Sequence, residues 1–184
     1  MVSELLAALP LSALLYAGLI GLTAIERLVE VRTSKKNAAW SLARGGQEHG
    51  QGHYPFMVVL HTGFLFACVA EVWMLHRTMP PAVSIALAVT AILLQCLRWW
   101  CITTLGPRWN TRVIFVPGLP RVTGGPYRYL SHPNYVVVAL EGLVLPLVHG
   151  AWLTALVFSI LNAGLMRVRL RVENEALQQM EATA

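Results

Sequence analysis

Charged side chains are scarce in this chain, and their scarcity limits its class. Of the 184 residues, 12% are charged and 56% are hydrophobic, whereas a small soluble domain carries about 25% charged residues. The nine acidic residues are all glutamates, and no two of them have the spacing of a metal site or of a glycosidase carboxylate pair. The composition therefore excludes an ordinary soluble domain and favours an integral membrane protein.

Cysteine is also rare. Cys68, Cys96 and Cys101 lie in or beside apolar runs and form no CxxC pair, which excludes a disulfide framework and a zinc site. His49 and His53 are four residues apart, but the glycine-rich segment around them offers no third ligand. We therefore expect no bound metal.

Long apolar runs are abundant. Residues 5–25, 55–75 and 80–97 each approach the roughly 20 residues that cross a hydrocarbon core. A fourth region, 135–166, is too long for one span, and Gly150 lies near its middle. We predict an all-α integral membrane protein with a single domain, 1–184, and five transmembrane helices, of which the last two form a short helical hairpin. The predicted spans are about 5–25, 55–76, 80–103, 133–148 and 151–167.

Basic residues outnumber acidic ones, and the net charge is +5. No nucleic-acid module accompanies them, so we expect no nucleic-acid partner and relate the charge to topology and to anionic lipid headgroups. Of the 14 Lys and Arg residues, only Arg77 falls between the second and third runs. Five spans with the N-terminus outside would place the other 13 on one face, which the positive-inside bias identifies as cytoplasmic.

The stretch GGPYRYLSHPNYVVVALEGL, residues 124–143, gathers polar and aromatic groups where an apolar helix begins. Pro133 suits a first helical turn, with Ser131 or His132 as the cap. The free N–H groups of a helix N-terminus attract a ligand carboxylate or phosphate, and tyrosines stack on a planar ring or face a sulfonium. A helix cap followed by interfacial tyrosines explains the same residues without a ligand. The tyrosines are Tyr127, Tyr129 and Tyr135.

A second polar stretch is RVRLRVENEAL, residues 167–177. Arg169 and Glu173 are four residues apart, as are Arg171 and Glu175. Such pairs form helical salt bridges that contribute only a few tenths of a kcal/mol when exposed. The alternative is a binding site in which a carboxylate accepts two ribose hydroxyls and a neighbouring arginine holds that carboxylate.

Further candidates lie at or within the predicted spans. Glu141 is about two turns into the fourth span, and an intramembrane carboxylate faces the bundle or a cavity by default. His53, Tyr54, Trp109 and Asn110 lie at the inner boundary of the second and third spans. An aromatic belt explains the tyrosine and the tryptophan, but it explains His53 and Asn110 less well.

Two of these motifs together resemble a known family. GPYRYLSHPNY, then an apolar hairpin, then RVENEAL is similar to the isoprenylcysteine carboxyl methyltransferase family, whose pattern is GPYxxxRHPxY followed by an arginine-led run of glutamates. Upstream, GQGHYP and LGPRWNTRVIFVPG resemble a bacterial branch encoded beside type III polyketide synthases, whose members O-methylate alkylpyrones and alkylresorcinols. The resemblance implies an S-adenosylmethionine-dependent enzyme in the bacterial inner membrane, with its active site facing the cytoplasm.

The resemblance also implies roles for single residues. His132 and Tyr135 would contact the cofactor, Glu173 and Glu175 would hold its ribose, and Arg171 would lie near the transferring methyl group and orient the acceptor. Pro133 and Asn134 would shape the helix start, and Tyr127 would join the cofactor site. His53 and Asn110 would assist Arg171 in catalysis. Substrate contacts are expected from Trp109, Glu141 and Arg128. The family's arginine before His-Pro is Ser131 here, so either Arg128 would replace it or its role is absent.

The predicted function is methylation of a hydroxyl on an alkylpyrone or alkylresorcinol. The partners would be this lipophilic small molecule and the bilayer, with the alkyl tail extending between helices into the membrane. Two alternatives stay open: methylation of an isoprenylcysteine carboxylate, a phospholipid amine or a small thiol, and a non-catalytic membrane scaffold of the same fold. The sequence does not set the oligomeric state.

Overall fold

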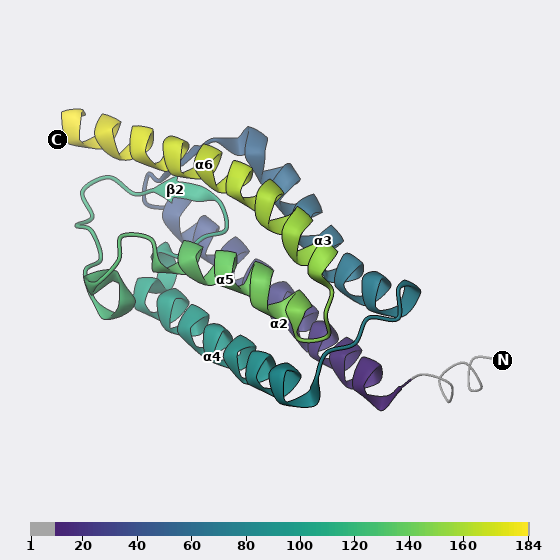
Figure 1. The fold of residues 1–184 in the computed structure, drawn as a ribbon. Helices are drawn as coiled ribbons and strands as arrows, with labels where there is room; N and C mark the ends of the chain where they lie inside the picture. The colour runs from purple at the N-terminus through teal and green to yellow at the C-terminus, as the bar shows by residue number, and fades with distance from the viewer. Residues whose placement is uncertain (1–9, 184) are drawn as a thin grey trace.

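Five long helices dominate the structure, a computed structural model that describes residues 10–183 (Figure 1). Proline stands in the first turn of three of them, where its missing N–H has no intrahelical partner to lose. The helices are α2 (Leu11–Leu42), α3 (Tyr54–Met74), α4 (Pro81–Leu105), α5 (Pro133–Leu147) and α6 (Trp152–Thr183). Short 3₁₀ turns are η1 (Gln51–His53), η2 (Gly106–Arg108) and η3 (Gly125–Arg128).

One small sheet completes the fold. Strand β1 (Gln47–His49) pairs antiparallel with β2 (Val113–Phe115), and Gln47 lies opposite Phe115. The sheet brings together the two long connections, 43–53 and 106–132, which are far apart in sequence. Both strands also pack against the second half of α6.

Within the described residues, four helices are long and apolar enough to cross a membrane. They are α2, α3 and α4, the last two with their adjoining 3₁₀ turns, and residues 152–176 of α6. The chain is therefore a mostly helical membrane protein. Helix α5 has 15 residues and is about 22 Å long, which is short of a ~30 Å hydrocarbon core. The fifth span, and with it the hairpin of two spans, stays a prediction. Residues 5–9 of the first predicted span lie outside the described part.

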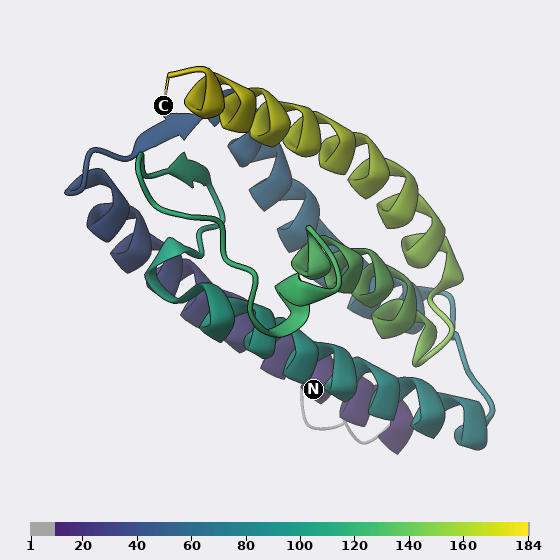
Figure 2. The same cartoon turned by 90° about the vertical axis from the view of Figure 1, so that its left-hand side faces the viewer.

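The two ends of the bundle differ. In Figures 1 and 2, the long connections, the sheet and the C-terminal end of α6 gather at one end, whereas the connections between α3 and α4 and between α5 and α6 lie at the other. The buried apolar core fills the half of the bundle away from the sheet, with Tyr16, Phe64, Leu145 and Phe158 among its members. The polar groups are thereby concentrated beside the sheet.

Residues 148–151 turn the chain between α5 and α6. Gly150 has φ +79°, and a Cβ there would lie 2.8 Å from the Thr78 carbonyl oxygen, so this position requires glycine. Glu71 of α3 then caps α6: one carboxylate oxygen accepts from the Thr154 N–H at 2.7 Å and the other from the Leu153 N–H at 3.2 Å. Arg77 pairs with the same carboxylate at 3.1 Å. Glu71, which lies in the second apolar run of the sequence, thus has a structural explanation as a helix cap.

A buried ionic network joins α2, α4 and α5. Arg98 of α4 donates to both oxygens of Glu30 on α2, one of them at 2.8 Å. Arg27 contacts Glu30 at 2.7 Å and Glu141 of α5 at 3.1 Å. Glu30 is 2% exposed and Arg98 is 7% exposed, so these charges are compensated by each other and not by water.

Candidate functional site

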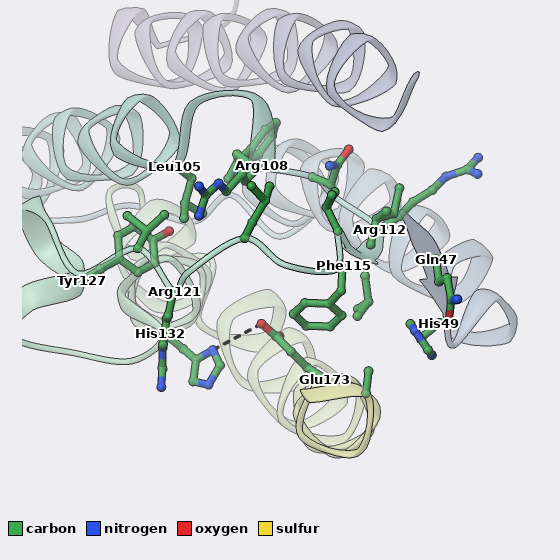
Figure 3. A pocket seen from close by; sticks show the side chains of 18 of the residues that line it. Gln47, His49, Leu105, Arg108, Arg112, Phe115, Arg121, Tyr127, His132 and Glu173 are labelled. Carbon is green, nitrogen blue, oxygen red and sulfur yellow. Dashed lines mark ion pairs between the residues drawn. The ribbon is translucent and has the colours of Figure 1, made fainter. Parts of the chain in front are cut away.

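A cavity of about 1370 Å³ opens at the sheet end of the bundle (Figure 3). Its walls come from the sheet, the connection 105–122, the start of α5 and the second half of α6. Pockets for one drug-sized ligand measure roughly 300–1,000 Å³. This cavity is therefore larger than a pocket for one such ligand.

The start of α5 forms the first polar part of the wall. His132 caps the helix in a non-helical conformation, with φ −133°, and Pro133 is buried in the first turn behind it. The His132 and Tyr135 rings stack, with an interplanar angle of 4° and centroids 5.1 Å apart. This pair presents an aromatic surface to the cavity.

Helix α6 supplies the facing part of this wall. The Tyr135 hydroxyl donates a hydrogen bond to one oxygen of the Glu173 carboxylate. His132 Nδ1 lies 3.8 Å from the other Glu173 oxygen. Figure 3 shows the His132 and Glu173 side chains pointing toward each other. The two motifs found in the sequence, on α5 and α6, therefore meet in one place.

Arg169 links Tyr135 and Glu173 to residues 110–111, which precede β2. Its Nε donates to the Tyr135 hydroxyl oxygen at 2.7 Å, and its guanidinium also donates to the carbonyl oxygens of Thr111 at 2.7 Å and Asn110 at 3.4 Å. The guanidinium carbon lies 5.3 Å from the centre of the Tyr135 ring. Arg169 thus brings a positive charge into the cavity.

Two amide side chains in the cavity wall have buried polar atoms without a protein partner. Both the Asn110 amide nitrogen and oxygen are in this state, and so is the Asn134 side-chain oxygen. Buried polar groups are almost always hydrogen-bonded. These atoms expose almost no surface, so a polar ligand in the cavity would reach them only if the two side chains turned toward it.

Tyr127 of η3 also lines the cavity. Burial raises the pKa of its hydroxyl above the ordinary value, and the nearby Cys101, Tyr135 and Glu173 raise it further, while Arg98 opposes them. The Tyr127 hydroxyl is consequently neutral around pH 7 and can donate a hydrogen bond.

The structure places some of the predicted site residues at this cavity. Seven of the predicted residues line it: Trp109, Asn110, Tyr127, His132, Asn134, Tyr135 and Glu173. Pro133 lies directly behind them. Three others, Arg128, Arg171 and Glu175, are exposed and lie outside its lining. Their predicted roles, like those of the lining residues, remain predictions.

Two further predicted residues lie apart from the cavity. His53 ends η1 and is not among the lining residues. Glu141 belongs to the ionic network and lines a separate space of about 30 Å³ beside His61 and Phe158. Such a space has room for about one water molecule, so its position favours a structural role for Glu141.

Sequence reasoning gave Arg169 only the role of a salt-bridge partner. The sequence did indicate that Arg169 lies beside Glu173, because the two residues are four apart and so share one helix face. Arg171 is two residues from Arg169, which is about 200° around the helix. Among the side chains that the structure describes, no three of His, Cys, Asp or Glu gather as a metal site would require.

Comparisons with known proteins place the sequence in a family. A sequence profile described as the isoprenylcysteine carboxyl methyltransferase (ICMT) family matches residues 85–179, which include the start of α5 and both Arg169 and Glu173. "Uncharacterized protein YpbQ" of Bacillus subtilis (strain 168) is 37% identical over 161 residues, covering 88% of this chain and 95% of that protein. No solved structure matches the chain.

Proposed function

We propose that this chain, which belongs to the isoprenylcysteine carboxyl methyltransferase family, uses S-adenosylmethionine to methylate a hydroxyl of a lipophilic acceptor, an alkylpyrone or an alkylresorcinol. Family membership and the four long apolar helices identify the chain as a membrane methyltransferase. The observation that carries the finer proposal is the cluster of His132, Tyr135, Arg169 and Glu173 on one wall of the cavity.

The residues present fit this cofactor. Glu173 has a carboxylate that can accept ribose hydroxyls, and the stacked His132–Tyr135 pair offers a surface for a planar base or a sulfonium. The amides of Asn110 and Asn134, whose buried atoms have no protein partner, could meet the polar edges of the base or the amino-acid part if their side chains turned into the cavity on binding. When bound, S-adenosylmethionine supplies an electrophilic methyl group on its sulfonium.

The acceptor is proposed to bind as an anion. Four arginines line the cavity, whereas Glu173 is its one glutamate within the described residues. The four are Arg108, Arg112, Arg121 and Arg169. Arg112 is paired with Glu48 at 3.3 Å, but the remaining excess of positive charge still favours an ionised hydroxyl or carboxylate over a phospholipid amine. The hydroxyl of an alkylpyrone is acidic enough to ionise near neutral pH, so its proton is lost to solvent before methyl transfer and no strong general base is needed. An alkylresorcinol hydroxyl is a weaker acid and must still give up its proton, which makes the alkylpyrone the favoured acceptor of the two.

Arg169 is proposed to hold that oxyanion. Its guanidinium is held by Tyr135 and by two backbone carbonyls, so it is already oriented before the acceptor arrives. The geometry favours Arg169 over the exposed Arg171 for this task. Positioning the oxyanion and excluding water would supply most of the rate enhancement.

Cofactor binding is the first test. Isothermal titration of the detergent-solubilised protein with S-adenosylhomocysteine should show saturable binding, and Glu173→Gln should weaken it by about tenfold or more, equivalent to about 1.4 kcal/mol. Glu175→Gln is the matched comparison, because that carboxylate is exposed. Absence of binding by the unaltered chain would leave the non-catalytic scaffold as the better explanation.

The acceptor is the second test. Labelled S-adenosylmethionine should be offered with alkylpyrones, alkylresorcinols, isoprenylcysteine, phospholipids and small thiols, and the products identified by mass spectrometry. An isoprenylcysteine carboxylate is the second candidate, because it is also anionic and matches the family's description. Methylation of amines or thiols alone would contradict the proposed acceptor class.

A further inference from the structure

The walls of the cavity differ in chemistry. Polar and aromatic groups come from residues 127–135 and from α6, whereas apolar side chains come from β2 and the connection after it. We propose that this second surface binds the alkyl chain of the acceptor, so that a loop, and not the membrane-spanning helices, sets chain-length preference. We call this surface the apolar wall; it consists of Phe115, Val116, Leu119 and Val122. The inference rests on the proposed methyl transfer.

Among the side chains that the structure describes, those of the apolar wall line the cavity and are partly exposed. Leu119 is 38% exposed, and Phe115, Val116 and Val122 are half-buried. Figure 3 shows the Phe115 ring turned into the same cavity as His132 and Glu173. An alkyl chain lying there would remove apolar surface of both partners from water, which is favourable.

The connection that carries the apolar wall is built to hold a defined shape. Pro117 and Pro120 restrict the backbone on either side of Gly118, which has φ +76°. Arg108 donates to the Pro120 carbonyl and ties the connection to η2. The backbone therefore holds the apolar side chains in place before a ligand arrives, so binding costs less conformational entropy.

The apolar wall also continues directly from the proposed anion site. Arg169 donates to the Thr111 carbonyl, and the chain then runs through β2 to Phe115. The three residues of β2 span about 10 Å. An acceptor with its oxyanion at Arg169 can thus lay its alkyl chain along this segment without entering the bilayer between helices, which differs from the path that the sequence predicts.

Chain-length dependence tests this inference. The probes are alkylpyrones whose alkyl chain is lengthened stepwise from methyl to pentadecyl, assayed with Phe115→Ala, Leu119→Ala and the unaltered chain. We expect KM for the long-chain probes to rise about tenfold, while KM for the methyl homologue, kcat and S-adenosylhomocysteine affinity change by less than about twofold. Leu93→Ala is the matched control, because Leu93 is 62% exposed on α4 and outside the cavity lining.

The outcomes separate this inference from the proposed function. If the unaltered chain binds S-adenosylhomocysteine and methylates the probes, but the two variants treat long and short chains alike, only the apolar wall is overturned. A rise in KM for long chains in Leu93→Ala would instead locate the tail against the membrane-facing helices. A chain that binds no S-adenosylhomocysteine would overturn both proposals together.

Discussion

At the scale of single residues, the choice between two arginines decides the proposed chemistry. Both stand four residues before a glutamate, so their sequence environments are nearly equivalent. Arg169 lies in the cavity and is held by Tyr135, whereas Arg171 is exposed. The difference follows from which face of α6 packs toward α5, and a local pattern does not carry that information.

Substitution of Arg169 should therefore affect turnover selectively. Arg169→Gln is expected to lower kcat by about 100-fold or more, because a positioned donor to the developing charge is lost, while S-adenosylhomocysteine binding stays measurable. Steady-state kinetics and calorimetry on the same preparations would check this. Arg167→Gln is the control, because Arg167 is exposed and, two residues from Arg169, lies on the opposite side of α6. If Arg171→Gln abolishes turnover and Arg169→Gln does not, the role belongs to Arg171.

At the scale of elements, the break between α5 and α6 shows what a local signal can predict. The sequence places a turn near Gly150, and the structure has α5 ending at Leu147 and α6 beginning at Trp152. The cap that follows was not predictable in the same way. Glu71 is 82 residues before Leu153 in sequence, so only packing of α3 against α6 makes it the helix cap.

The turn can be tested with a matched glycine pair. Gly150→Ala should lower the free energy of unfolding by more than about 1 kcal/mol. The new side chain would strain a positive φ, and its methyl group would press against the Thr78 carbonyl. Gly164→Ala on α6 has open space around it and should be neutral or stabilising by up to about 1 kcal/mol. Unfolding midpoints in one detergent would compare them. Equal midpoints for the two variants would contradict the strained turn.

At the scale of the whole molecule, buried charges connect helices that are distant in sequence. Glu30 of α2 and Arg98 of α4 compensate each other in the interior, and Arg27 extends the network to Glu141. The network lies between the apolar core and the cavity end of the bundle. It gives Glu141 a structural partner, although its position in a predicted span alone made it a candidate for substrate contact.

Breaking one side of this network should destabilise the fold. Glu30→Leu would leave the buried Arg98 with only its longer contact to Glu141, at 3.6 Å, and should lower the free energy of unfolding by about 3–5 kcal/mol, whereas the double substitution Glu30→Leu with Arg98→Leu should recover much of that loss. Thermal unfolding in detergent is the measurement. Glu48→Gln is the control, because its partner Arg112 is exposed, and such pairs contribute about 0–1 kcal/mol. A double variant no more stable than Glu30→Leu would argue against the pairing.

The sequence by itself determined the membrane class, most helix positions and the two motifs of the candidate site. These features depend on local quantities: the length of apolar runs, the φ restriction of Pro133 and the spacing of Glu173 from its arginine. Tertiary structure alone decided that these motifs meet, that Arg169 and not Arg171 enters the cavity, and that the connection after β2 forms its apolar wall. Each of these depends on contacts between segments far apart in sequence, and the energies of such contacts are not encoded in any single stretch of the chain.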